Sequence, residues 1–102
     1  MRMARLAAHD VDTLFARALV ADAALHGIAA TVLDWHSHPW YSATFVGARH
    51  TATLRIEGDA TGWFAALPEN EFVLRGHLVA DIVARLDGPA TVKLEALTLV
   101  YA

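Results

Sequence analysis

The sequence predicts an α+β fold, a two-layer sandwich in which an antiparallel sheet of about four to five strands packs against one main helix (11–26) on one face, with a short second helix (60–67). Three observations predict it. One long segment has apolar residues at helical spacing, several later segments alternate between apolar and polar residues, and isolated glycines and prolines separate these segments. The 102 residues match the size of a single domain, 1–102.

The main helix is predicted over residues 11–26. Its apolar positions recur at the i, i+3, i+4 spacing that places them on one face: Val11, Leu14, Phe15, Ala18, Leu19 and Leu25. Asp10 can cap the first turn, Gly27 suits the position that ends a helix, and Asp22 interrupts the apolar stripe. Residues 2–8 could extend this helix backwards or form a short strand.

The strands are predicted from period-two patterns. Residues 28–36 form the first strand, with a turn or sheet edge at Ser37-His38-Pro39, and residues 43–57 form the second, which Gly47 could split into a hairpin. After the short helix, which Asp59 caps and Pro68 stops, residues 71–86 and 91–101 form a hairpin through the turn at 87–89.

Each long strand is expected to present one aliphatic and one polar face, which is typical of an antiparallel sheet covered on one side. In the strand 71–86, Leu78, Ala80 and Ile82 are predicted to face the core. The polar face is predicted to carry Arg49, Thr51, Arg55, Arg75, His77, Asp81 and Arg85.

Composition excludes several classes of function. The 8 basic residues are spread singly and the net charge is −3, so we expect no nucleic-acid partner. The chain has no cysteine, which excludes disulfides and thiolate chemistry, and no apolar run of membrane-spanning length, so we expect no membrane partner and a cytoplasmic location. Because 56% of the residues are apolar, an unusual share for so small a domain, we expect a homo-oligomer, most simply a dimer.

The histidines raise the question of a metal site. In a strand, Asp34, His36 and His38 would point to the same side, and His50 or His77 could supply a further ligand. The alternative is that these rings are solvated or bonded to the backbone. We expect no metal and no cofactor; a metal, if one binds, would use His36 and His38.

The His-Ser-His-Pro segment at 36–39 resembles the corresponding segment of JAMM-type zinc isopeptidases. That family requires a serine eight residues after the second histidine and an aspartate ligand three residues further on, where this chain has Val46 and Arg49. Arginine cannot replace an anionic zinc ligand, and no glutamate precedes Glu57 to serve as the family's general base. The resemblance therefore does not extend to the family's catalytic site.

Two other groups of side chains could bind a small molecule. Aromatic residues near the histidines could line an apolar pocket, and the arginines of the polar face could bind a carboxylate or phosphate. The candidate ligand-binding residues are Trp35, His36, His38, Trp40, Arg75 and His77. The sequence has neither a nucleophile elbow nor a glycine-rich phosphate loop, and we assign no catalytic residue.

These observations predict a self-associating structural or interaction module without catalytic activity. Two alternatives stay open. One is a protein that binds a small molecule through the aromatic and histidine pocket or the arginine-bearing face. The other is a histidine-dependent enzyme, with or without a metal.

Overall fold

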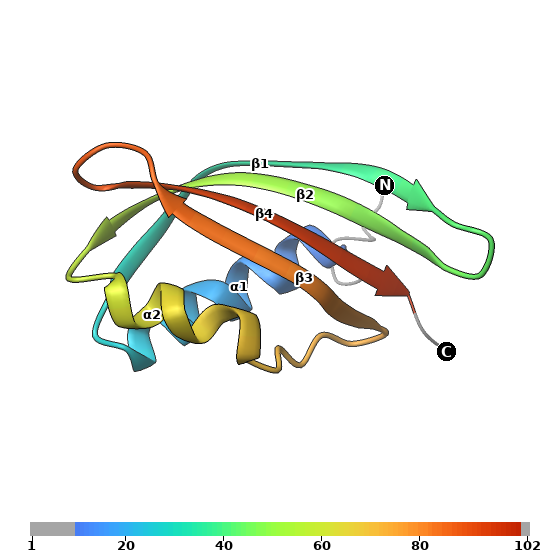
Figure 1. The fold of residues 1–102 in the computed structure, drawn as a ribbon, viewed down its shortest axis with the longest axis horizontal. Helices are drawn as coiled ribbons and strands as arrows, with labels where there is room; N and C mark the ends of the chain where they lie inside the picture. The colour runs from blue at the N-terminus through green and yellow to red at the C-terminus, as the bar shows by residue number, and fades with distance from the viewer. Residues whose placement is uncertain (1–9, 101–102) are drawn as a thin grey trace.

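The computed structural model describes residues 10–100, and the segment 2–8 lies outside the described residues (Figure 1). In chain order the elements are α1 (Val11–Leu25), β1 (Ala29–Tyr41), β2 (Val46–Glu57), α2 (Thr61–Ala66), the 3-10 turn η2 (Leu67–Glu69), β3 (His77–Leu86) and β4 (Thr91–Val100). The predicted α+β fold, with one antiparallel sheet, a main helix and a short second helix, is confirmed.

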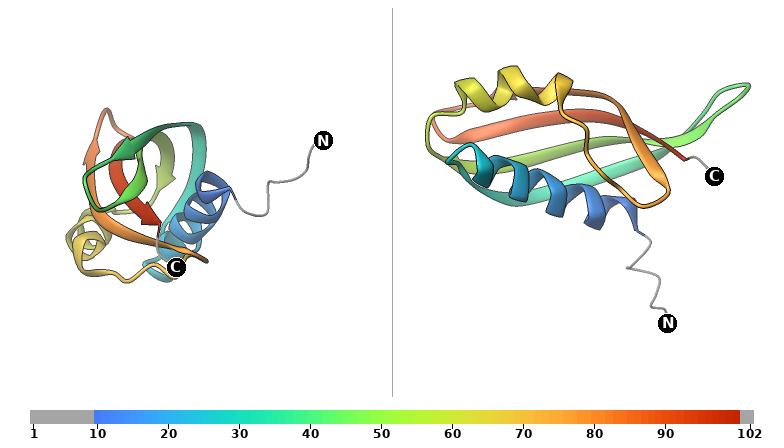
Figure 2. Two further views of the ribbon diagram at one scale, coloured as in Figure 1. Left: turned by 90° about the vertical axis from the view of Figure 1, so that its right-hand side faces the viewer. Right: turned by 90° about the horizontal axis from the view of Figure 1, so that it is seen from below.

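The strands form one antiparallel sheet in the order β1-β2-β4-β3. The β1–β2 and β3–β4 hairpins lie side by side, with β2 against β4 in the centre and β1 and β3 at the two edges. Both helices pack on the same face of this sheet (Figures 1 and 2). We call that face the covered face and the opposite one the open face.

Helix α1 is positioned by its caps and by its buried stripe. The Asp10 side chain accepts a hydrogen bond from the Asp12 amide at 2.9 Å, and Gly27 follows the helix with φ of +77°. Phe15 and Leu19 are fully buried against the sheet. Burying each such side chain stabilises the fold by about 1.5–3 kcal/mol.

Asp22 interrupts the apolar stripe because it joins α1 to the second helix. Its Oδ2 accepts hydrogen bonds from Trp63 Nε1 at 2.8 Å and from Asn70 Nδ2 at 2.7 Å. Trp63 is fully buried, so its indole N–H needs this acceptor. The carboxylate therefore holds α1, α2 and the end of η2 together under the sheet.

Strand β1 is longer than the sequence predicts. Of the two alternatives predicted for residues 37–39, a turn or a sheet edge, the structure shows the edge, because Ser37, His38 and Pro39 continue the ladder of edge strand β1 and pair with residues 48–50 of β2. The missing amide of Pro39 is tolerated because β1 is an edge strand. The reversal follows Tyr41, where Ser42 Oγ accepts the Phe45 amide at 3.0 Å.

Strand β3 is shorter than the predicted strand 71–86. Residues 71–76 form a loop with a single bridge between Leu74 and His77, and Gly76 has φ of +76°. A positive φ is incompatible with a continuing strand, which is why the ladder with β4 begins at His77.

A β-bulge between Val79 and Asp81 reverses which residues of β3 face the core. Ile82 is buried as predicted, but the prediction that Leu78 faces the core is wrong, since Leu78 is 43% exposed and Val79 packs against the core instead. A second bulge, between Val32 and Asp34, has the corresponding effect in β1. Both bulges lie in edge strands.

Gly47 lies inside β2 and does not form a hairpin turn. It pairs with Trp40 on one side and Leu99 on the other. A Cβ built on Gly47 would clash with the carbonyl oxygen of Thr98 on β4. Glycine is therefore required here for the close approach of two central strands.

Candidate functional site: the open face of the sheet

Strand pairing arranges the open face in four rows that run across the sheet. We name each row by its β1 residue or its character. The rows are the apolar row (Trp40, Gly47, Leu99, Leu78), the His38 row (His38, Arg49, Leu97, Asp81), the His36 row (His36, Thr51, Glu95, Val83) and the Asp34 row (Asp34, Thr53, Lys93, Arg85).

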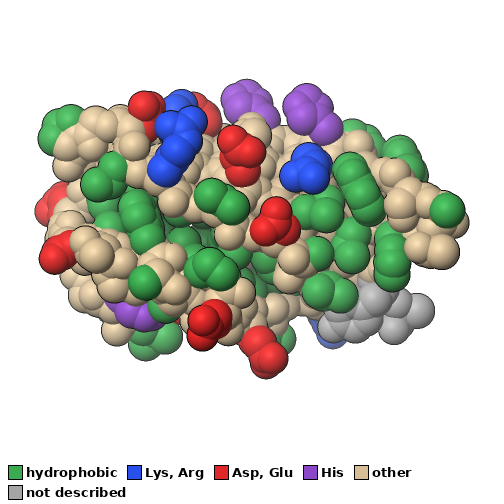
Figure 3. Space-filling view, in the orientation of Figure 1, with side chains coloured by type: hydrophobic (Ala, Val, Ile, Leu, Met, Phe, Trp, Pro, Cys, Tyr) green, Lys and Arg blue, Asp and Glu red, His purple; other side chains and the backbone are tan. Residues whose placement is uncertain are grey.

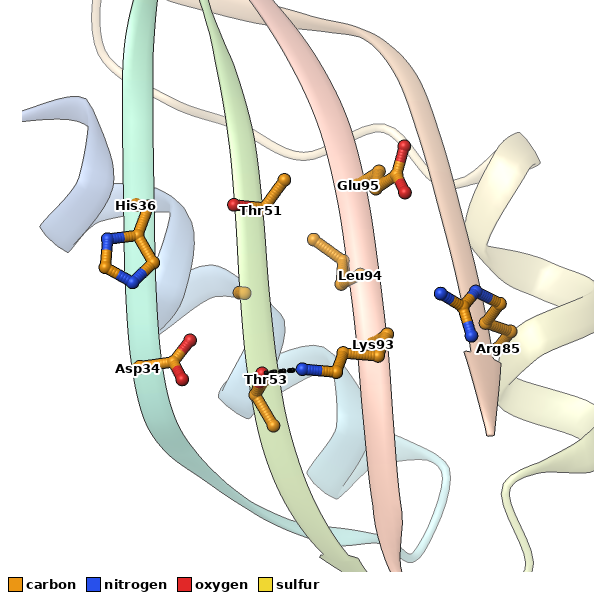
Figure 4. Close-up of a pocket in the computed structure, with 9 residues that line it drawn as sticks. Asp34, His36, Thr51, Thr53, Arg85, Lys93, Leu94 and Glu95 are labelled. Carbon is orange, nitrogen blue, oxygen red and sulfur yellow. Dashed lines mark hydrogen bonds between the residues drawn. The ribbon is translucent and has the colours of Figure 1, made fainter. Parts of the chain in front are cut away.

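A hollow of about 390 Å³ lies over the Asp34 and His36 rows. Figure 4 shows their side chains standing on the face turned away from the helices, with Lys93 Nζ donating to Thr53 Oγ1 at 3.0 Å. Lys93 covers Thr53, which is only 9% exposed. The hollow is thus lined by carboxylates, hydroxyls, a histidine and two cations.

The charged groups of the open face have no partners of opposite charge within residues 10–100. Figure 3 shows basic, acidic, histidine and hydrophobic side chains interspersed over the strands in the upper part of the view. Such charges are accessible to a binding partner, because no ion pair within the described part of the chain has to be broken first.

The candidate residues of β1 separate into two groups. His36, His38 and Trp40 lie on the open face, and Asp34 shares that side as predicted, because these residues pair with open-face positions of β2. Trp35 lies on the covered face, where its ring meets that of Phe15 edge-on at 5.5 Å. Trp35 and Trp40 therefore do not line one pocket.

The remaining candidates lie at the other edge of the sheet. Arg75 belongs to the loop before β3, and the ring of His77 is bonded to the Arg75 carbonyl at 2.9 Å. His77 lies on the same side of β3 as Val79, which packs against the core. His77 therefore does not lie beside Arg85 on the open face, and Arg75 lies outside the strand. The six candidates occupy three separate places.

The described residues contain no group of three or more histidine, cysteine, aspartate or glutamate side chains that could hold a metal ion. His36 and His38 are both exposed on the open face. His50, considered above as a further ligand, lies buried on the covered face, and His77 is at the opposite sheet edge.

The structure also contains a buried polar cluster on the covered face, which the sequence did not predict. His50 is 1% exposed, its Nε2 lies 2.8 Å from Thr98 Oγ1, and its Nδ1 accepts from Trp35 Nε1 at 3.1 Å. Asp12 Oδ2 accepts from Ser37 Oγ at 2.9 Å, which pins the start of α1 to β1. His50 is thus buried between α1 and the sheet, whereas the bond between Ser37 and Asp12 is exposed.

Burial lowers the pKa of His50 despite the nearby carboxylates of Asp12 and Asp10, so the folded state favours the neutral ring. In the neutral ring, Nδ1 accepts from Trp35 and the protonated Nε2 donates to Thr98. This tautomer is consistent with Asp12 Oδ1, which has no hydrogen-bond partner in the part of the chain that the structure describes.

The sequence predicts that Arg85 lies on the polar face. It does not reveal that Asp34, Lys93 and Glu95 lie around the same hollow. The signal was present in the alternation of each strand. The sequence does not reveal the strand order or the two bulges, and these determine which residues share a row.

No protein-family model, curated protein or solved structure matches this chain. Within residues 10–100, no helix has both the length and the apolar character needed to cross a membrane.

Proposed function

We propose that this protein is a self-associating structural or interaction module, and that the open face of its sheet packs against a second copy of the chain. The observation that carries the proposal is the apolar row at one end of that face. Leu78 is 43% exposed, and Trp40, Leu97 and Leu99 are each partly exposed beside it. Aromatic and aliphatic anchors next to polar groups are common in protein–protein contacts.

The charges beyond the apolar row support a second copy as the partner. The His38, His36 and Asp34 rows carry acidic Asp34, Asp81 and Glu95 together with basic Arg49, Lys93 and Arg85. A face that carries both signs can complement itself, whereas a face of one sign would repel a second copy.

A different surface competes with the open face for this role. A shallow apolar groove of about 480 Å³ runs between α1 and β1, lined by Ala16, Arg17, Val20, Ala21, Ala24 and Val32. It offers small side chains and one arginine, but neither an aromatic anchor nor an acidic group to pair with that arginine. We therefore favour the open face.

The experiment is the mass of the protein in solution, measured by sedimentation equilibrium on the wild type, Leu78→Glu and Val20→Glu. We expect a dimer for the wild type and for Val20→Glu, and a monomer for Leu78→Glu, because a carboxylate would be buried in the contact. Far-UV circular dichroism checks that each variant is folded. A monomeric wild type, or a dimeric Leu78→Glu, would refute the proposal.

The hollow over the Asp34 and His36 rows supports a second candidate, the binding of a small molecule that carries both a cationic and an anionic group. Asp34 and Glu95 could bind the cation, while Arg85 and Lys93 could bind the anion. Native mass spectrometry of protein purified gently from its host tests this alternative. A retained organic mass that Arg85→Ala abolishes would favour it over self-association.

A further inference from the structure

Complementary polar side chains occupy the two edge strands at the same level of the open face: Asp34 and Arg85 carry opposite charges, and a ring N–H of His38 can donate to the carboxylate of Asp81. In the Asp34 row, Asp34 is on β1 and Arg85 is on β3; in the His38 row, His38 is on β1 and Asp81 is on β3. Three strand spacings of about 4.8 Å, or about 14 Å in total, separate the members of each pair. Neither pair can therefore form within one chain.

The order of hydrogen-bond donors and carboxylates is reversed between the two edges. Along β1, histidine lies nearer the apolar row and aspartate farther from it, whereas along β3 the aspartate is nearer and the arginine farther. Exchanging the two edges places Asp34 over Arg85 and His38 over Asp81. A two-fold rotation about an axis that runs parallel to the strands, between β2 and β4, makes this exchange.

We propose that two copies pack face to face about such an axis, so that Asp34 pairs with Arg85 of the second copy and His38 pairs with Asp81 of the second copy. Each pair then occurs twice in the dimer. This inference rests on the self-association proposed above and specifies its geometry. Stacked sheets lie about 10 Å apart at an angle of about 30°, a geometry that long side chains such as Arg85 can span.

The same rotation also brings the remaining residues of the open face against compatible residues of the second copy. The apolar row packs on itself, with Trp40 over Leu78 and Gly47 over Leu99. The central positions bring Thr51 over Glu95 and Thr53 over Lys93, and no like charges meet.

A two-fold axis that lies across the strands is less favourable. It would also bring complementary side chains together, pairing Asp34 with His38 and Arg85 with Asp81. However, it would place the apolar row over Thr31, Arg55 and Thr91, where an arginine would be buried without a partner.

Charge exchange between the two edges tests the geometry. The dimer dissociation constant is measured by analytical ultracentrifugation for Asp34→Arg, for Arg85→Asp and for the double variant. Each single change brings like charges together twice, and we expect about tenfold weaker association or more. The double variant restores both pairs and should return close to the wild-type constant. An equimolar mixture of the two single variants should form heterodimers more readily than either forms homodimers.

Two control variants carry the same charge changes outside the contact, namely Glu71→Arg in the loop before β3 and Arg17→Asp on α1. Both side chains are exposed, and both variants should dimerise like the wild type. The axis across the strands predicts the opposite result for the double variant, because the introduced arginine would meet His38 and the introduced aspartate would meet Asp81.

The outcomes separate this inference from the proposed function. If Leu78→Glu dissociates the dimer while the double variant stays as weak as the single ones, self-association by the open face stands and the strand-parallel axis is overturned. The same conclusion follows if neither single variant weakens the dimer. A monomeric wild type would overturn both.

Discussion

Asp12 Oδ1 lies 3.3 Å from His50 Nδ1, yet it accepts no hydrogen bond from any residue between 10 and 100. The ring nitrogen carries no proton to donate, because it already accepts the indole N–H of Trp35 at 3.1 Å. Protonation of His50 would supply that proton, but it would take the acceptor away from Trp35 and place a charge in a buried site. The arrangement therefore couples the protonation of one ring to the packing of α1 on the sheet.

The lowered pKa of His50 predicts that stability falls as the pH drops. In the unfolded chain the ring titrates near 6.5, while the folded chain holds it neutral to lower pH. Below 6.5 the unfolded state binds more protons, so the free energy of unfolding decreases with falling pH until the folded ring is also protonated. The slope can reach at most about 1.4 kcal/mol per pH unit for one proton.

Urea unfolding at a series of pH values measures this slope. The His50→Gln variant should lose this contribution, whereas a variant with both His36→Ala and His38→Ala should keep it. A stability that is constant, or that rises, as the pH falls below 6.5 in the wild type would contradict the role given to His50.

Removing the Asp22 carboxylate should destabilise the fold by about 2–4 kcal/mol, because two charge-assisted hydrogen bonds are lost and the buried Trp63 indole N–H is left without an acceptor. Asp22→Ala is compared with Asn70→Ala, which removes only one of the two bonds and should cost less. Thermal or chemical denaturation measures both. Equal losses in the two variants would show that the Trp63 bond contributes little.

Two glycine substitutions should have opposite effects. Gly47→Ala should destabilise the protein by about 1–3 kcal/mol, because the added methyl group meets the β4 backbone at Thr98. Gly62→Ala, in α2, meets nothing within 4 Å and should stabilise the protein by up to about 1 kcal/mol. Melting temperatures measure both effects. A Gly47→Ala variant as stable as the wild type would mean that β2 and β4 can move apart with little loss of stability.

At a protein concentration low enough to keep the chain monomeric, replacing both His36 and His38 with alanine should change stability by no more than about 0.5 kcal/mol, because both side chains are exposed in the single chain and form no side-chain hydrogen bond within residues 10–100. Denaturant titration measures this difference. Zinc should not raise the melting temperature of the wild type more than that of the double variant. A zinc-dependent increase confined to the wild type would instead support the metal site that the two histidines suggest.

The main features of the fold follow from local patterns. The Asp10 cap, the apolar face of α1 and Gly27 predict the helix to within one residue of its observed end. The alternation in β2 and β4 predicts the core positions in the middle of these strands, since Leu54, Ile56, Val92 and Leu94 are buried. At the strand ends, Val46 and Val100 belong to the same pattern but are each 50% exposed. These signals are strong because each depends on neighbours within a few residues.

The edge strands were predicted less well, and the reason is physical. The sequence at residues 37–39 is compatible with either a turn or a sheet edge, and only the strand order shows that Pro39 stays in the ladder of an edge strand. The bulges near Leu33 and Ala80 shift the pairing by one residue, which the alternation alone does not reveal. For this reason the ligand-binding residues predicted from the sequence lie on different faces and edges of the sheet.

The bulges have a consequence for how the protein behaves when it is concentrated. Both edge strands of the sheet, β1 and β3, contain a β-bulge, and on β1 a proline also removes one backbone donor. An incoming strand cannot extend such borders with an unbroken hydrogen-bond ladder, so growth into fibrils by strand addition is disfavoured. A chain this rich in aliphatic residues can therefore leave one broad surface available for docking without also providing a template for open-ended aggregation.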